Sequence, residues 1–121
     1  MSEDRTVTVP TLDCGDVTVP EPGWCVGHDG EPVNALCDLG HRGTEHFLGT
    51  DDQAVFVAQL SQYPHGSGPR DIHLYIEAVT DAASLAPEGV EALATVLAAA
   101  SAQLRPLALQ LAVLRTEEAG R

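Results

Sequence analysis

At 121 residues the chain has the length of a single domain. Its formal net charge is −12, from 18 aspartates and glutamates against six arginines that are scattered along the sequence. A protein that binds nucleic acid needs clustered cations, so this composition excludes nucleic acid as a partner. Solubility, a basic protein partner and mimicry of nucleic acid remain as explanations of the acidic charge.

The first ten residues, MSEDRTVTVP, contain neither the basic nor the apolar segment of a secretory signal, and no stretch approaches 18 uncharged apolar residues. We therefore expect a cytoplasmic protein that does not contact a membrane. The three cysteines are an odd number, and two of them alternate with histidines. That arrangement favours metal binding over disulfides.

Two short strands are predicted at the start of the chain. Residues 5–9 and 15–19 both alternate polar residues with valine, and each run ends at a proline. The segment between them, DCGD, has the composition of a turn, because Asp and Gly tolerate unusual backbone angles. We expect an antiparallel hairpin with Cys14 at its tip.

The next stretch, WCVGHDGEPVNALCDLGHRGTEH, concentrates two of the three cysteines and three of the five histidines. Cys25 and His28 form a C-x2-H pair, Cys37 and His41 form a C-x3-H pair, and eight residues separate the pairs. Two close pairs of thiolate and imidazole ligands joined by a loop are typical of tetrahedral zinc. The spacing therefore predicts one Zn2+ ion with a structural role.

The fourth ligand is left open by the spacing. Cys14 reaches the same ion if the hairpin tip folds beneath the loop, and His46 is a further candidate besides Cys37. The alternative to metal binding is that the cysteines are small buried apolar residues. A catalytic zinc would need an open position and a base such as Glu31 or Glu45. Because the motifs of zinc proteases and zinc deaminases are absent, no catalytic residue is assigned.

Four further strands are predicted, over residues 32–37, 46–48, 53–62 and 71–79. The last of them alternates in a way that predicts four inward side chains, namely Ile72, Leu74, Ile76 and Ala78. The link YPHGSGPR between the two longer strands is rich in Gly and Pro and is expected to be a hairpin loop.

The last third of the chain is predicted to be helical, with Pro87 at the first helical position. Apolar residues recur there at alternating spacings of three and four, which predicts one apolar stripe: Val90, Leu93, Leu97, Ala100, Leu104, Leu107, Leu111 and Leu114. Pro106 is expected to kink or divide this helix. We expect the leucines beyond it to form a homodimer, and the alternative is a helical hairpin that breaks at Pro106.

The runs EPGWCVGHDGEP (residues 21–32) and DLGHRGTE (residues 38–45) resemble a family of short uncharacterised proteins from high-GC Gram-positive bacteria. The resemblance covers most of the chain, and its Trp-Cys and His elements are the specific part. It implies Cys25, His28 and His41 as the shared metal ligands, and it favours Cys14 over Cys37 as the fourth. It implies no activity.

These features predict an α+β fold, in which a small antiparallel sheet of four or five strands carries a zinc-binding loop and a long C-terminal helix. We expect one zinc-stabilised domain over residues 1–121, β-rich over 1–83 with its metal loop in 14–46, and helical over 84–116. The expected function is a small zinc-binding interaction or regulatory module with a protein partner. The alternatives are a zinc-dependent hydrolase and an acidic nucleic-acid mimic that inhibits a basic partner.

Overall fold

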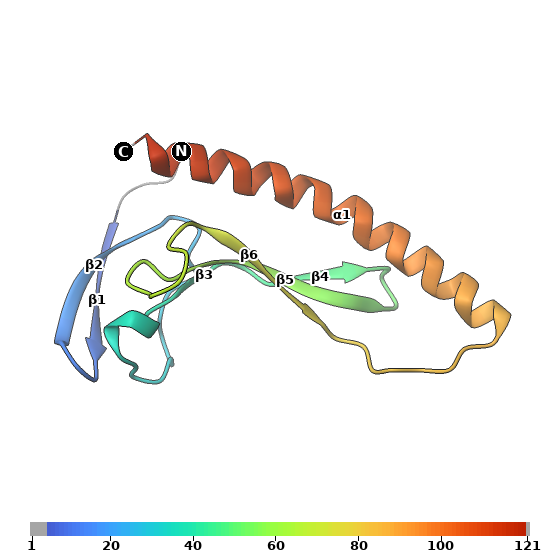
Figure 1. Ribbon diagram of the computed structural model, residues 1–121, viewed down its shortest axis with the longest axis horizontal. Coiled ribbons are helices and arrows are strands. Elements are labelled where there is room, and N and C mark those ends of the chain that lie inside the picture. Colours follow the sequence, from blue (N-terminus) through green and yellow to red (C-terminus); the bar gives the residue numbers. More distant parts are fainter. Residues whose placement is uncertain (1–4, 121) are drawn as a thin grey trace. The chain divides into compact units, whose positions relative to one another are not determined.

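The computed structural model describes residues 5–120, and this part of the chain consists of two compact units. The first unit contains residues 5–44 and 60–73, and the second contains residues 45–59 and 74–120. Small antiparallel sheets and one long C-terminal helix make up the elements, which confirms the predicted α+β fold (Figure 1). This division does not test the expectation of one domain over residues 1–121, which stays a prediction.

The first unit begins with a two-stranded antiparallel sheet of β1 (Arg5–Thr11) and β2 (Gly15–Glu21). The hairpin was predicted, but both strands continue through the prolines that were expected to end them. Pro10 lies opposite Asp16 and Pro20 lies opposite Thr6. In a sheet of two strands each strand is an edge, so a proline that cannot donate a hydrogen bond is tolerated where its nitrogen faces outward.

The rest of the first unit is built from η1 (Leu36–Asp38), β3 (His41–Arg42) and the end of β5 (Ala54–Gln62). The strand predicted over residues 32–37 is wrong. Asn34 makes only an isolated parallel bridge to Thr11, and η1 follows it. The Asp13 carboxylate accepts the hydrogen bond of the Leu36 amide at 2.9 Å, which takes away a donor that a strand would need.

The second unit contains β4 (His46–Gly49), most of β5, most of β6 (His73–Ala78) and α1 (Pro87–Ala119). β4 pairs antiparallel with β5, and β6 also pairs with β5. These strands were predicted to within a few residues. Two of the four side chains expected to point inward from β6, Ile76 and Ala78, are exposed instead.

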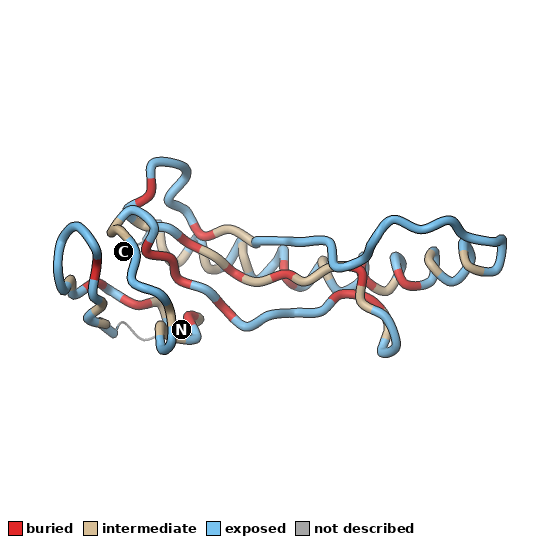
Figure 2. Tube along the Cα trace, turned by 90° about the horizontal axis from the view of Figure 1, so that it is seen from below, coloured by how far each residue is buried: buried red, intermediate tan, exposed pale blue. Residues whose placement is uncertain are grey.

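The core of the second unit lies between its strands and α1. Its buried members are Leu48, Val55, Ala58, Val96, Ala100 and Leu107. Figure 2 shows the buried positions recurring along the helix between exposed ones. The apolar stripe predicted for the helix is only partly buried, because Val90 is 54% exposed and Leu97 is 44% exposed. A strict repeat of three and four drifts around a straight helix of 3.6 residues per turn, so one line of residues cannot face the sheet throughout.

Pro106 lies inside α1, which is assigned as one helix on both sides of it. Pro106 was expected to kink or divide the helix, and the second of these outcomes is wrong. The alternative of a hairpin that breaks at this proline is wrong as well. Pro106 and Ala102 are both exposed, so water can bond the Ala102 carbonyl that loses its helical partner. Leu107, one of the leucines beyond Pro106 that were expected to form a homodimer, is instead 8% exposed within the core of its own chain.

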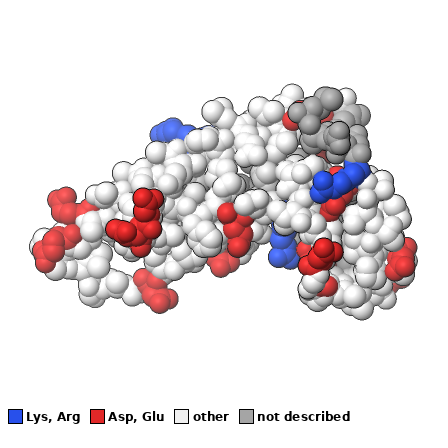
Figure 3. Space-filling view, turned by 180° about the vertical axis from the view of Figure 1, so that it is seen from behind, with Lys and Arg blue, Asp and Glu red and all other residues white. Residues whose placement is uncertain are grey.

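α1 is also long and apolar enough to span a membrane, by length and composition alone. The mean hydropathy of its most apolar window of 18 residues is 1.4, and 17% of that window is buried. Core helices of soluble proteins meet the same criterion, although those are mostly buried. Figure 3 shows small groups of acidic side chains with uncharged surface between them on the face that it draws.

Candidate metal centre

A tight turn after β2 brings the Trp-Cys motif beside β3. The Cys25 amide donates to the Pro22 carbonyl at 3.0 Å, and the Val26 amide donates to the Arg42 carbonyl at 2.9 Å. Gly27 then adopts a φ of 103°, a conformation that a residue with a side chain rarely adopts. Cys25 and His28 therefore lie next to His41 at the start of β3.

Four side chains meet at this point, those of Glu21, Cys25, His28 and His41. Each offers one ligand atom, and these atoms all lie within 4.8 Å of one another. His28 Nε2 lies 2.8 Å from Glu21 Oε1 and 3.8 Å from Cys25 Sγ. Ligands bound at about 2.0–2.3 Å around a tetrahedral ion lie about 3–4 Å apart, so the group has the dimensions of a metal site.

Two atoms of the group are buried without a hydrogen-bond partner among the described residues, namely Glu21 Oε1 and His41 Nδ1. Glu21 Oε1 lies close to His28 Nε2, but the two atoms do not have the angles of a hydrogen bond. Leaving a buried polar atom unpaired costs about 1–3 kcal/mol. A cation between these atoms would remove that cost, so the four residues fit a metal ion.

The groups around the four side chains orient them as outer partners orient metal ligands. The Glu31 carboxylate lies 3.2 Å from His28 Nδ1, which leaves Nε2 directed at the group. The Gly27 amide donates to Cys25 Sγ at 3.4 Å, a contact that favours a thiolate. The Trp24 and His41 rings are nearly perpendicular, with their centres 6.4 Å apart.

Arg5 of β1 holds the acidic member of the group. Its Nε donates to Glu21 Oε2 at 3.1 Å, and its second terminal nitrogen donates to the Cys25 carbonyl at 3.0 Å. Oε2 is therefore occupied by Arg5, while Oε1 is directed at the other ligand atoms. This arrangement favours a carboxylate that binds an ion through one oxygen.

Burial and mutual charge set the protonation of the metal-free group. Burial acts to raise the pKa of Glu21, but the neighbouring Cys25 side chain, the hydrogen bond from Arg5 and the charges of His28 and Arg5 outweigh it, so this pKa is lowered. Burial raises the pKa of Cys25, against the opposing effect of the Gly27 and Arg42 amides. Burial and then the charge of His28 lower the pKa of His41. Metal binding would therefore displace a proton from the Cys25 thiol.

Three residues expected as ligands from the sequence, Cys25, His28 and His41, lie together in this group. The fourth member is Glu21, whereas Cys14, Cys37 and His46 are exposed and lie outside it. Cys14 precedes β2 and Glu21 ends it, and seven steps at about 3.3 Å each along an extended strand place the hairpin tip roughly 20 Å away.

Glu21 and Arg5 were missed by reasoning from the sequence. The available signal was the position of Glu21 only four residues before Cys25. A carboxylate oxygen is an ordinary zinc ligand, so a search limited to Cys and His was too narrow. Nothing in the sequence marks Arg5, because its role depends on the pairing of Arg5 with Glu21 across the hairpin.

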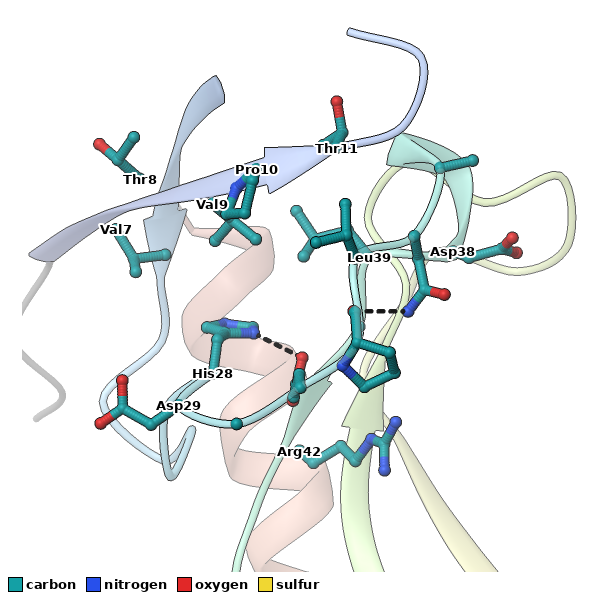
Figure 4. A pocket seen from close by; sticks show the side chains of 17 residues that line it. Val7, Thr8, Val9, Pro10, Thr11, His28, Asp29, Asp38, Leu39 and Arg42 are labelled. Carbon is teal, nitrogen blue, oxygen red and sulfur yellow. Dashed lines mark hydrogen bonds and ion pairs between the residues drawn. The ribbon is translucent and has the colours of Figure 1, made fainter. Parts of the chain in front are cut away.

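A cavity of about 290 Å³ lies beside the metal group, between β1 and residues 28–42. His28 and Glu31 line it, whereas Glu21, Cys25 and His41 do not. Figure 4 shows the His28 ring at the wall of this cavity, with its contact to the Glu31 carboxylate drawn as a dashed line. The metal group therefore meets the cavity through His28 alone.

A family described as a domain of unknown function, DUF6907, matches the chain over residues 6–113. No curated protein and no solved structure matches it.

Proposed function

The chain belongs to the DUF6907 family, and we propose that residues 5–44 and 60–73 of this domain form a zinc-stabilised interaction module. The observation that carries the proposal is the group of four ligand atoms within 4.8 Å of one another, two of them buried without a hydrogen-bond partner. One thiolate, two imidazoles and one carboxylate suit zinc better than harder cations, which prefer oxygen ligands alone.

The role proposed for this zinc is structural. Four protein ligands complete a tetrahedral ion and leave no position for a reacting water. The alternative of a zinc-dependent hydrolase would require Glu21 to leave the ion, and its second oxygen is already held by Arg5. Structural zinc contributes on the order of 10 kcal/mol in small zinc domains at neutral pH.

The first test is elemental analysis of the chain purified without an affinity tag. We expect about one zinc per chain, because the four donors fit one tetrahedral ion. The double variant Cys25→Ser with His28→Ala should lose the metal and unfold at a much lower temperature. Cys14→Ser is the matched control, since this exposed cysteine lies outside the group. Folded protein that binds no zinc would contradict the proposal.

The proposed partner is a second copy of the chain, bound through the outer side of α1. Leu109 is 70% exposed and Val113 is 58% exposed, and they lie one helical turn apart. Alanines occupy much of the same side further toward the N-terminus, which allows two helices to approach closely. A two-fold pair would cover this side with its own equivalent. We propose that this pairing shields the apolar side chains on the outer side of α1 from water. We also propose that the protein is cytoplasmic.

A further inference from the structure

The outer edge of β1, the edge that faces away from β2, carries backbone groups that the hairpin does not use. In an antiparallel pair of strands, residue pairs that exchange hydrogen bonds alternate with pairs that do not. Pro10 lies opposite Asp16 and Pro20 lies opposite Thr6, and a proline cannot donate a hydrogen bond. Both pairs therefore belong to the second kind, in which the backbone groups point outward.

Thr8 belongs to the same alternation. It lies opposite Thr18 and two residues before Pro10, so its amide and its carbonyl point away from β2. The next outward amide after position 10 is that of Leu12, and it donates to the Asn34 carbonyl at 3.0 Å. The outer edge of β1 is therefore already used for pairing at one end.

The segment that reaches this edge at Asn34 does not follow it further. Asn34 makes an isolated bridge to Thr11, and within residues 5–120 no strand pairs with the outer edge at Thr8. The cavity of about 290 Å³ borders β1 at this level, since Val7, Thr8 and Val9 all line it. An unpaired strand edge is a template for a further strand.

The walls of the cavity combine apolar and acidic groups. Val9 and Leu39 contribute apolar surface, and Figure 4 shows Val9 directed from β1 toward the side on which His28 lies. Three carboxylates and one guanidinium also line the cavity, those of Asp29, Glu31, Asp38 and Arg42. An arginine side chain suits such walls, because its stem packs on apolar surface while its head pairs with carboxylates.

We infer that the outer edge of β1 binds an extended, arginine-containing peptide of a partner protein, which adds to the hairpin as a third strand. The inference rests on the proposed interaction module and names its ligand. The Thr8 amide donates to a peptide carbonyl, and the Thr8 carbonyl accepts from a peptide amide. Because side chains alternate along a strand, an arginine enters the cavity while its two neighbours point away. The net charge of −12 attracts a basic partner.

The probe is a capped peptide of alternating valine and arginine, labelled at one end and titrated with the full chain under fluorescence anisotropy. We expect saturable binding. The same peptide methylated on its backbone amides should bind about 10-fold more weakly or worse, because it cannot donate to the Thr8 carbonyl. A peptide with glutamate in place of arginine should not bind. Equal binding of the plain and methylated peptides would overturn the inference.

Thr8→Pro tests the edge from the side of the protein. It removes the outward amide, and the ladder to β2 should remain because Pro10 and Pro20 already occupy the same alternation. We expect the affinity for the plain peptide to fall about 10-fold or more.

Thr18→Pro is the matched control. It places the same ring on the residue opposite Thr8, whose amide points away from β1 on the other edge of the hairpin. Both variants lose the same hydrogen bond between the Thr8 and Thr18 hydroxyls. Equal affinities in the two variants would overturn the inference. The methylated peptide decides the question where a variant does not fold, because it leaves the protein unchanged.

The role of the acidic walls is tested with Asp29→Asn and Asp38→Asn combined, since both exposed carboxylates line the cavity. The affinity for the arginine peptide should fall about three-fold or more. Asp51→Asn with Asp52→Asn is the control, because it removes the same charge from two exposed aspartates outside the cavity. Equal losses in the two double variants would show that only net charge acts, and the inference would fail.

Zinc content and molecular mass are measured in the same samples, so that the two proposals can fail separately. Folded, zinc-loaded protein that does not bind the arginine peptide overturns the inference and leaves the zinc site standing. Peptide binding by protein that holds no zinc contradicts the zinc site alone. A dimer that Thr8→Pro dissociates, without peptide binding, would show that a second copy occupies the edge and would also overturn the inference.

Discussion

Glu31 orients the ring of His28, because its carboxylate lies 3.2 Å from Nδ1. In Glu31→Gln the amide replaces a charged acceptor, so His28 becomes a weaker and less firmly oriented ligand. We expect the zinc affinity to fall about 10-fold or more, with little change in the fold. Competition with a chromogenic chelator measures it.

The control for Glu31 is Glu45→Gln, which removes the same charge from an exposed residue outside the metal group. It should bind zinc as tightly as the unmodified chain. An unchanged affinity in Glu31→Gln would mean that the contact to His28 does not reach the ion.

His41 makes the metal-free protein sensitive to acid. Burial, followed by the charge of His28, lowers its pKa below the ordinary value of 6.5. The folded state therefore keeps His41 neutral where the unfolded chain already binds a proton. This contribution to stability is present above pH 6.5 and is lost as the pH falls through 6.5 toward the folded pKa.

Urea unfolding of the metal-free protein at a series of pH values tests this expectation. The midpoint should fall between neutral pH and about pH 5, and His41→Gln should flatten the fall in that window. Glu21, whose pKa is also lowered, contributes in the same direction below its ordinary value of 4.5. A profile that His41→Gln leaves unaltered would show that another group titrates.

On the scale of the elements, α1 owes its position to a few residues that face the strands of its unit. Val96 is 4% exposed in the core and Val90 is 54% exposed on the same helix. Val96→Ala removes buried methyl groups and should cost about 2 kcal/mol of unfolding free energy. Val90→Ala makes the same chemical change at the surface and should cost less than about 0.5 kcal/mol.

Chemical denaturation followed by circular dichroism compares the two valine variants directly. Both substitutions have the same effect on helix propensity, so the difference between them reports burial alone. Equal losses would indicate that α1 does not pack on the strands through Val96.

The elements most visible in the sequence were those with a clear period. The valine alternation predicted β1 and β2, and the apolar spacing with Pro87 at its start predicted α1. Residues 32–37 were mistaken for a strand because a side chain, Asp13, takes a backbone donor that the sequence assigns to a ladder. Such a contact depends on the fold of the whole unit.

The candidate site could be predicted from the sequence to a similar degree. Cys25, His28 and His41 stand out because thiols and imidazoles are rare residues at short spacing. Glu21 does not stand out among 18 acidic residues, since only its burial at 6% exposure distinguishes it. Burial of a polar residue is set by tertiary structure and has no local signal.

For the molecule as a whole, the exposed apolar residues on the outer side of α1 determine whether the protein is a monomer or a dimer. We expect a dimer in light scattering, because Leu109 and Val113 would otherwise present apolar surface to water. The double variant Leu109→Glu with Val113→Glu should be monomeric. Gln110→Glu is the control, since it adds charge to an exposed position that is already polar.

A monomer at high protein concentration would contradict self-association. Sedimentation of the chain with vesicles of neutral lipid would then indicate that the helix contacts lipid, in keeping with the mean hydropathy of 1.4 in its most apolar window of 18 residues. The same glutamate variants should abolish that sedimentation if the outer side of α1 contacts lipid.

The route of the chain through β5 has a consequence for biosynthesis. β5 starts in one unit and ends in the other, and its last residue, Gln62, pairs with His41, one of the four proposed metal ligands. A nascent chain that has emerged from the ribosome only as far as β4 already carries all four metal donors, but it lacks the strand that fixes the last of them. Metal capture should therefore become tight only once Gln62 has emerged, while α1 is still being translated.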